Sequence, residues 1–432
     1  MNRLLIIHYH LNPGGVTRII ESQVKSLKEF DPSLQIIVVT GHCENPDIIR
    51  RHGAEIIINS KLNYLSSKTS DLNSEYKTIM SFFSGLFQKE DIIHVHNLNL
   101  GKNPLLTLAI SEFAFKGFPI LNHAHDFAED RSQNWQFLKD IIERKFGKNL
   151  SSVLYPYLPN FKHATLNSFD KRRLIDYGIP EEKVFLLPNP VSFSGSETEL
   201  NYSDIRTKIC EQLKIDSGKK LVTYPVRVIR RKNIGEYILL ASILSEEANW
   251  LVTQPPRNPA EIKPYEQWKN FCKMETIQLI FEAGVSIDFE TLIRSSDFCF
   301  TTSVKEGFGM VYLEPWLLDT PVIGRDLHQI TEDIKQSGIE FPLLYNAMKI
   351  PFKNKLVDFP SLSMSDQQSF ISNLKRREEL KNEVLNENSF IEKLLNSVNK
   401  SIIDKNKSTI IQEYSLNHYA KQLQKIYQKL VK

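Results

Sequence analysis

Short apolar runs that alternate with helical patterns are the feature that most constrains the fold of this chain. Several of the runs are apolar almost throughout, as expected for strands of a sheet that is buried on both faces. This alternation indicates an α/β protein with a doubly wound parallel sheet. In the first half we predict strands Arg3–His8, Gln35–Thr40, Glu55–Ile58, Ile92–His96 and Ile120–His123, with helices at Pro104–Phe115 and Ser168–Tyr177.

The alternation stops at a polar segment and then restarts. Pro188-Asn189-Pro190 leads into a stretch rich in Ser, Glu and Asn through about Ser203, which is typical of a linker. A chain of 432 residues is also too long for one ordinary core. We predict domains at 1–190 and 191–410 and a C-terminal amphipathic helix at 411–432. The second domain should contain strands Leu221–Pro225, Trp250–Thr253, Ile277–Phe281, Phe298–Thr302 and Val322–Gly324, helices Ile234–Leu244 and Met310–Leu318, and polar helices over Phe341–Ser408 with a loop near Pro351–Pro360.

Composition excludes several classes of protein. The 54 Lys and Arg against 51 Asp and Glu give a net charge of +3, so nothing indicates a nucleic-acid partner. The four cysteines are far apart and form no CxxC pair, which fits a reducing cytoplasm. The apolar run Leu4–Ile7 is too short for a signal peptide or a membrane span. We expect a soluble cytoplasmic protein and leave peripheral contact with the inner face of a membrane open.

Ligands of open α/β sheets bind beyond the carboxyl ends of the strands, where three segments of this chain carry polar or flexible residues. Gly14-Gly15 follows the first strand, and two readings are open: a tight turn that needs positive φ, or a close approach of the backbone to a ligand. His94 and His96 share one face of their strand, and His123 and His125 follow the next one. A metal site is one reading of these histidines, but we favour a polar donor to a ligand, especially from His125.

In the second half, the strand Leu221–Pro225 runs into a basic segment that contains Arg227 and Lys232. Arginine suits a bidentate grip on phosphate and lysine supplies a compact charge, so both would neutralise a diphosphate leaving group. Taken alone, the segment also fits a solvated basic loop.

The most informative stretch is KEGFGMVYLEPW, residues 305–316. In one continuous helix Glu306 and Glu314 would lie about 80° apart around the axis. With glycines between them, we expect Glu306 in a loop and Glu314 inside a helix. The backbone N–H groups of Phe308, Gly309 and Met310 would lie between the two carboxylates and suit a phosphate. Carboxylates on either side of an anion must accept hydrogen bonds from hydroxyls, such as those of a sugar and a ribose.

With these residues in place, the chain resembles the retaining GT-B glycosyltransferases, specifically glycosyltransferase family 4. The resemblance extends over nearly the whole chain, and the Glu306-x7-Glu314 motif is its most specific part. It implies two Rossmann-like domains that face a cleft, with the C-terminal helix returning to the N-terminal domain. The matching segments are Gly14-Gly15, His94-x-His96, His125-Asp126, Leu187–Val191, Arg227 with Lys232, Glu306-x7-Glu314 and the C-terminal helix.

The resemblance also implies roles for individual residues. Glu306 would contact the donor sugar and Glu314 the ribose, while Arg227 and Lys232 would hold the diphosphate with backbone help from Phe308–Met310. His125 would face the donor sugar, and Gly14-Gly15 would border donor and acceptor. The expected reaction is front-face transfer of a hexose from a nucleotide-diphosphate sugar to an acceptor hydroxyl with retention. No metal or other cofactor is expected, and the sequence contains no DxD motif.

Alternatives remain open at this point. A nucleotide-sugar epimerase or hydrolase could use the same architecture, and so could a ligand-binding module without catalysis. The chain also departs from the family where Val226 precedes Arg227, at Thr253–Pro259 and at Gly324–His328, where small residues are more usual. The acceptor would bind mainly to the N-terminal half, where Asp126–Arg131 carries charged residues. The acceptor's identity and the oligomeric state are not indicated.

Overall fold

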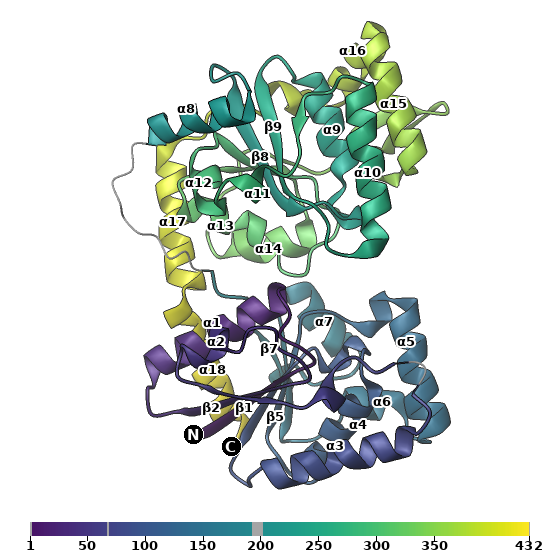
Figure 1. Cartoon of the computed structure of the whole chain (residues 1–432), viewed down its shortest axis with the longest axis vertical. Helices are drawn as coiled ribbons and strands as arrows, with labels where there is room; N and C mark the ends of the chain where they lie inside the picture. Colours follow the sequence, from purple (N-terminus) through teal and green to yellow (C-terminus); the bar gives the residue numbers. More distant parts are fainter. Residues whose placement is uncertain (1, 67–68, 192–201, 432) are drawn as a thin grey trace. The chain divides into compact units, whose positions relative to one another are not determined.

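A computed structural model describes residues 2–66, 69–191 and 202–431, although not the side chains of residues 202 and 203. The chain forms two compact units: unit 1 comprises Met1–Pro190 and Tyr414–Lys432, and unit 2 comprises Val191–Glu413. Figure 1 shows the elements of both units. The central part of the predicted linker, residues 192–201, lies outside the described residues.

Unit 1 is built on a seven-stranded parallel sheet with strand order β3-β2-β1-β4-β5-β6-β7. The chain moves outward from β1 through β2 to β3 and then returns to place β4 on the other side of β1. The strand order therefore reverses between β1 and β4, the position at which ligands bind in open sheets of this kind. The strands are β1 (Arg3–His8), β2 (Gln35–Thr40), β3 (Glu55–Ile58), β4 (Ile92–His96), β5 (Ile120–Ala124), β6 (Phe161–Thr165) and β7 (Val184–Leu186).

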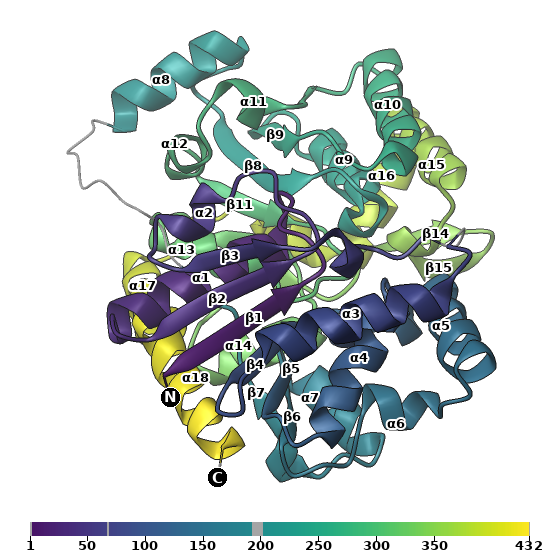
Figure 2. The same cartoon turned by 60° about the horizontal axis from the view of Figure 1, so that its bottom comes forward.

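Helices cover both faces of this sheet because alternate residues of each strand point to opposite sides. Leu5 and Ile7 of β1 belong to one hydrophobic cluster. Leu4 and Ile6 belong to another, to which the C-terminal helix α18 contributes Leu423. In Figure 2, α18 is drawn in yellow beside the purple helix α1, with which it is in contact. The helices are α1 (Gly15–Phe30), α2 (Asp47–Arg50), α3 (Leu72–Leu86), α4 (Pro104–Phe115), α5 (Ser132–Lys139), α6 (Leu150–Leu154), α7 (Ser168–Asp176) and α18 (Leu416–Leu430).

Unit 2 has a six-stranded parallel sheet with strand order β10-β9-β8-β11-β12-β13, which reverses between β8 and β11. Trp250 of β9 and Phe300 of β11 are buried in its core. The strands are β8 (Lys220–Arg227), β9 (Ala248–Gln254), β10 (Leu279–Ile280), β11 (Phe298–Thr301), β12 (Val322–Arg325) and β13 (Leu344–Tyr345). The helices are α8 (Tyr202–Leu213), α9 (Ile234–Ile243), α10 (Pro259–Met274), α11 (Ala283–Ser286), α12 (Phe289–Arg294), α13 (Glu314–Leu317), α14 (His328–Gln336), α15 (Met364–Arg376), α16 (Glu378–Glu387) and α17 (Lys400–Tyr414).

Two predicted segments differ from the structure. The predicted helix Met310–Leu318 is a 3₁₀ turn at Met310–Tyr312 followed by the short helix α13, because Pro315 near the start of α13 cannot donate a hydrogen bond to the preceding turn. The loop predicted near Pro351–Pro360 is largely an antiparallel hairpin of β14 (Lys349–Phe352) and β15 (Lys355–Asp358). Its two turn residues both have positive φ, as in the tight turns that join such strands.

Among the described residues, no helix combines the length and the apolar character that a membrane span needs.

Candidate active site

Lys232 and Glu306 meet where the strand order of unit 2 reverses. Lys232 follows β8 and Glu306 follows β11, and these two strands are neighbours in the sheet. The Lys232 ammonium forms an ion pair with Glu306 Oε1, while Arg231 Nη1 lies 2.9 Å from Glu306 Oε2. Only 7% of the Glu306 side-chain surface and 13% of that of Lys232 are exposed. The structure therefore brings together two of the predicted residues and adds Arg231, which the sequence did not single out.

Burial and charge act in opposite directions on this cluster. Burial alone would raise the pKa of the Glu306 carboxyl, but the positive charges of Lys232 and Arg231 outweigh it, so the pKa lies below its usual value. Burial lowers the pKa of Lys232, and the Glu306 charge opposes that effect. Glu306 is therefore ionised at neutral pH and offers only hydrogen-bond acceptors.

Hydrogen bonds hold the turn that carries Lys232 between the strands. Asn233, in the left-handed region at φ 51°, donates through Nδ2 to the carbonyl of Thr302 at 3.1 Å. Thr302 Oγ1 donates to the Lys232 carbonyl at 3.1 Å, and Tyr224 Oη donates to the same oxygen at 2.8 Å. The position of the Lys232 backbone is thus fixed by residues of β8 and of the segment after β11.

A second ionic network is linked to this turn. Arg325, at the end of β12, contacts the carboxylates of Glu236 at 2.5 Å and Asp358 at 2.8 Å, and Glu236 is fully buried. Glu236 Oε2 also accepts a hydrogen bond of 2.9 Å from Asn233 Nδ2, which links the network to the Lys232 turn. Arg325 lies in the segment Gly324–His328, where the resemblance led us to expect small residues. Its large charged side chain is accommodated because Glu236 and Asp358 pair with it.

Arg227, predicted to share the diphosphate with Lys232, makes a different contact. It ends β8, and its Nε donates to Gln254 Oε1 at 3.3 Å. Burial, followed by the charge of Arg257, lowers its pKa. Arg231, rather than Arg227, is the arginine that pairs with Glu306. The Arg230-Arg231-Lys232 run was the sequence signal, but its spacing does not show which cation points toward the glutamate.

The segment between the two glutamates needs its second glycine. Gly309 has φ +82°, and a Cβ atom there would lie 2.7 Å from Ile330 Cγ2. Glu306 lies in the loop as expected, but Glu314 is the first residue of α13 and not a residue inside a helix. Phe308 and Glu314 are both 7% exposed, and Met310 begins the 3₁₀ turn.

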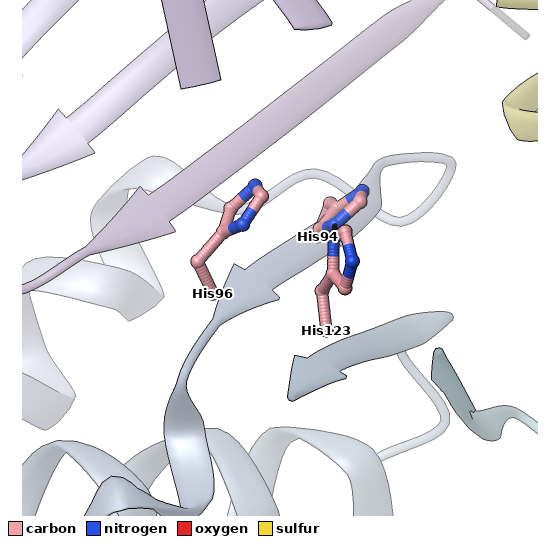
Figure 3. A group of neighbouring side chains, drawn as sticks. All are labelled: His94, His96 and His123. Atoms are coloured by element: carbon pink, nitrogen blue, oxygen red, sulfur yellow. Dashed lines mark hydrogen bonds between the residues drawn. The ribbon is translucent and has the colours of Figure 1, made fainter. Parts of the chain in front are cut away.

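In unit 1, buried histidines occupy the corresponding reversal point. His94 and His96 extend from β4 and His123 from the adjacent β5, and their rings gather on one side of the sheet (Figure 3). His94 Nε2 lies 3.2 Å from His123 Nδ1, and His96 Nδ1 lies 2.8 Å from His125 Nε2. His8 at the end of β1 joins them because its Nδ1 donates to the His96 carbonyl at 3.1 Å.

Burial keeps these rings uncharged. It lowers the pKa of His8 to about 4 and of His123 to about 3, and it holds the pKa of His94, His96 and His125 well below the usual value. Each ring therefore carries one N–H donor and one acceptor at neutral pH.

The histidine cluster also has the geometry of a potential metal site. One ring nitrogen from each of His94, His96 and His123 lies within 4.8 Å of the others, and neutral imidazole is a common metal ligand. However, both His96 nitrogens already have hydrogen-bond partners in Gln23 and His125. Most of the ring nitrogens are therefore engaged in hydrogen bonds, whereas the buried His123 Nε2 has no hydrogen-bond partner among the described residues. The sequence prediction that no metal is needed stays a prediction.

Asn97 places the backbone of His125, a role that the sequence did not reveal. It follows β4 in the left-handed region at φ 60°, and its Oδ1 accepts hydrogen bonds from the backbone N–H of His125 at 2.8 Å and of Asp126 at 3.0 Å. The asparagine immediately after the His-x-His pair was the available signal, because Asn tolerates this conformation better than most residues.

Several side chains of the charged segment Asp126–Arg131 form ion pairs or hydrogen bonds within unit 1. Arg131 Nη2 pairs with Asp126 Oδ1 at 2.9 Å, and Arg173 Nη1 pairs with Asp130 Oδ1 at 2.9 Å. Glu129 accepts a hydrogen bond of 2.8 Å from Tyr155 Oη. The Asp126–Arg131 pair remains substantially exposed.

The Gly14-Gly15 pair does not have the conformation that one of its two readings required. Gly14 caps α1 with an extended backbone at φ −175°, and Gly15 is the first helical residue. A Cβ atom on Gly15 would meet nothing within 4 Å, and one on Gly14 would lie at an ordinary 3.7 Å from the Asn12 carbonyl. The reading of a turn that needs positive φ is therefore wrong.

Comparisons with known proteins bear on the fold and the class of this protein, although no family model matches the chain. Mannosylglucosyl-3-phosphoglycerate synthase of Petrotoga mobilis is 33% identical over 353 residues, which cover 78% of this chain and 67% of that protein. Mannosylglucosylglycerate synthase of Thermotoga maritima is 26% identical over 337 residues, or 69% and 71% of the two chains. The solved structure of Anabaena Alr3699/HepE in complex with UDP-glucose has a TM-score of 0.62 at 12% identity and covers 99% of each chain.

Two parallel-sheet units and these relatives identify the class. The chain belongs to the GT-B glycosyltransferases. It is an enzyme that transfers a sugar, as the resemblance implied.

Proposed function

We propose that this glycosyltransferase moves a sugar from a nucleotide-diphosphate donor to an acceptor hydroxyl, with retention of configuration and without a metal ion. The observation that carries the proposal is the buried Lys232–Glu306–Arg231 cluster at the reversal point of the unit 2 sheet. It combines cations suited to a diphosphate with an ionised carboxylate suited to sugar hydroxyls.

In the proposed reaction, the acceptor oxygen forms a bond to the anomeric carbon on the face from which the diphosphate departs. The bond between that carbon and the phosphate oxygen breaks, and the acceptor proton passes to the leaving diphosphate. Lys232, Arg231 and Arg227 stabilise the negative charge that develops on the diphosphate. Glu306 accepts hydrogen bonds from the donor sugar, Glu314 binds the ribose, and the backbone of Phe308, Gly309 and Met310 assists with the phosphates.

Unit 1 supplies the remaining roles in this proposal. His125 contacts the donor sugar near the anomeric carbon, and Gly14 and Gly15 allow a ligand to approach the backbone. The open space around a Cβ at Gly15 supports the second of these roles, because the fold itself gives no reason for a glycine there.

For the substrates, we propose a mannosyl donor and a small anionic glycoside of the glucosyl-3-phosphoglycerate type as acceptor. The support is the Petrotoga relative, whose name gives mannosylglucosyl-3-phosphoglycerate as its product and which is 33% identical to this chain. A cation-rich site is also compatible with anionic ligands.

The test is a thermal-shift panel of GDP-, UDP- and ADP-sugars with the purified protein, followed by mass analysis of products from phosphorylated and unphosphorylated glucosylglycerate acceptors. We expect stabilisation by one nucleotide sugar and a product with one added hexose, whose anomeric configuration NMR should show to match the donor. Turnover should survive extensive treatment with EDTA. Inversion of configuration or loss of turnover in EDTA would refute the corresponding part of the proposal. Free sugar or an epimer as main product would favour the hydrolase or epimerase alternative, which none of the relatives reported above supports.

A further inference from the structure

A buried glutamine of helix α1 connects the C-terminal helix to the histidine cluster. Gln23 is fully buried, and its Oε1 lies 2.8 Å from His96 Nε2. Its Nε2 lies 2.9 Å from His94 Nδ1 and 2.9 Å from the hydroxyl of Tyr427 in α18. The Tyr427 hydroxyl is also 2.7 Å from His94 Nδ1. One amide therefore contacts two of the buried histidines and the last helix of the chain.

The structure places the oxygen of the Gln23 amide toward His96 Nε2 and its NH₂ group toward His94 Nδ1 and the Tyr427 hydroxyl. The Tyr427 oxygen accepts one amide hydrogen. The second amide hydrogen and the Tyr427 hydroxyl hydrogen share the single lone pair of His94 Nδ1, from which the Tyr427 oxygen lies 2.7 Å away.

This orientation propagates to His125. A carboxamide oxygen can only accept, so His96 Nε2 must carry the hydrogen. Because burial holds the pKa of His96 well below its usual value, the ring is neutral and its Nδ1 is an acceptor. His125 Nε2, 2.8 Å away, must then be the donor in their hydrogen bond. With Nε2 protonated in a neutral ring, His125 Nδ1 carries a lone pair.

We propose that Gln23 is a positioning residue: through His96, it holds His125 in the Nε2–H tautomer, so that His125 offers Nδ1 as a hydrogen-bond acceptor to a hydroxyl of the bound sugar. The part concerning the sugar rests on the proposed function. The tautomer itself rests only on the contacts within unit 1. This revises the expectation from the sequence, in which His125 was to donate a hydrogen bond.

Two substitutions at opposite ends of the relay separate positioning from simple loss of a buried contact. Gln23→Met keeps the approximate shape of the side chain but removes the acceptor for His96, so His96 and His125 should lose their fixed tautomers. Tyr427→Phe removes a buried hydroxyl from the other end and leaves the Gln23 amide with His94 as an acceptor. It should therefore leave the His125 tautomer unchanged.

The experiment is long-range ¹H–¹⁵N NMR of the full chain labelled with ¹⁵N-histidine, with the His125 signals assigned by their loss in His125→Asn. We expect the Nε2–H tautomer of His125 in the wild type and in Tyr427→Phe, and a mixture of tautomers in Gln23→Met. With the verified donor and acceptor, kcat of Gln23→Met should fall at least tenfold with KM for the donor changed less than threefold. Tyr427→Phe should stay within threefold of the wild type in both constants.

Each outcome is decisive. A wild-type spectrum with His125 protonated at Nδ1 would overturn the relay, and this spectrum is obtained even if Gln23→Met does not fold. The expected spectra together with wild-type kcat in Gln23→Met would overturn the positioning role. If no nucleotide sugar is a donor, the proposed function fails, while the spectra still decide whether the relay exists.

Discussion

The two units share a topology but bury polar groups at their reversal points in opposite ways. Unit 1 uses neutral histidines that hydrogen-bond to one another, to Gln23 and to Tyr427. Unit 2 uses full charges, in the Lys232–Glu306–Arg231 and Glu236–Arg325–Asp358 groups. Ten of the eleven histidines lie in unit 1, and unit 2 contains only the exposed His328.

In the proposed function, this difference gives each unit its own role in sugar transfer. Neutral rings with fixed tautomers can orient hydroxyl groups but supply little charge. Ion pairs can stabilise the charge that moves onto a diphosphate, which is usually the larger catalytic effect. The same difference predicts that the two units lose stability for different reasons. A buried neutral base is destabilised by acid, whereas a buried ion pair is destabilised when one partner is removed.

Acid should have the largest effect, and it should act on unit 1. An unfolded histidine takes up a proton below pH 6.5, whereas buried His8 does so only near pH 4, and His123 and His163 only near pH 3. Between these values the unfolded state binds more protons, so stability falls as the pH falls. By pH 5.5 each buried histidine should cost on the order of 1 kcal/mol relative to neutral pH. Together, the six buried histidines, which are His8, His94, His96, His123, His125 and His163, should remove several kcal/mol.

Peptide-resolved hydrogen exchange at pH 7.5 and 5.5, corrected for intrinsic exchange rates, measures this difference. Unit 1 should lose protection at pH 5.5 while unit 2 keeps it. The lowered pKa of Glu306 has the opposite consequence: its ion pair stabilises unit 2 above the carboxyl's unfolded pKa and is lost only when the pH falls through the still lower folded pKa. Simultaneous loss of protection in both units at pH 5.5 would contradict the comparison.

Removal of one partner from the buried network of unit 2 should have the next largest effect. Arg325→Met would leave buried Glu236 without its cation, and such a change typically costs about 3–5 kcal/mol. Adding Glu236→Gln should recover part of that loss because it removes the uncompensated charge. The matched control is Arg376→Met, whose side chain is 68% exposed and pairs with Glu275; it should cost about 1 kcal/mol or less. Urea unfolding of the four proteins measures these differences, and equal losses for Arg325→Met and Arg376→Met would contradict the assignment.

The sequence predicted the fold well wherever the strands are largely apolar runs. The strands Arg3–His8, Gln35–Thr40, Glu55–Ile58 and Ile92–His96 were predicted to the residue because they are nearly continuous apolar runs. The strands β6 and β7 were not predicted, since the polar Lys162 and His163 interrupt the first of them and the second has only three residues. Local composition gives little signal for such interrupted or very short strands.

The chemistry of the site was predicted less completely than its location. The residue types after the strands gave Lys232, Glu306 and the histidines, but pairing depends on side-chain direction. Arg231, Asn97 and Gln23 were therefore missed. Gln23 had a detectable signal, since it lies among Ile19, Ile20, Val24 and Leu27 on the apolar face of α1. A glutamine at such a position is buried and needs partners, but the sequence does not show that they are histidines.

Loss of the Lys232 charge should reduce catalysis more than stability. Lys232→Ala should lower kcat with a verified donor at least tenfold, because removal of one group that stabilises the developing charge costs about 3 kcal/mol in other enzymes. Arg230→Ala is the matched control, since it removes an exposed cation from the same turn and should leave kcat within about twofold. Glu306→Gln should also abolish most transfer while a thermal melt shows the fold intact. Wild-type turnover in Lys232→Ala would remove unit 2's cluster from the mechanism.

The smallest effect on stability is expected for a substitution at Gly15. This substitution tests whether the glycine is needed for ligand binding or for the fold. Gly15→Ala has open space and a helical backbone, so the free energy of unfolding should stay the same or rise by up to about 1 kcal/mol. Gly324→Ala in unit 2 is the opposite case, because φ is +125° and the added Cβ would lie 2.1 Å from the Thr301 carbonyl oxygen. It should destabilise by about 2 kcal/mol or more. If a ligand approaches the backbone at Gly15, kcat/KM should fall several-fold in the more stable variant; unchanged kcat/KM would remove Gly15 from the site while leaving the roles of unit 2 untouched.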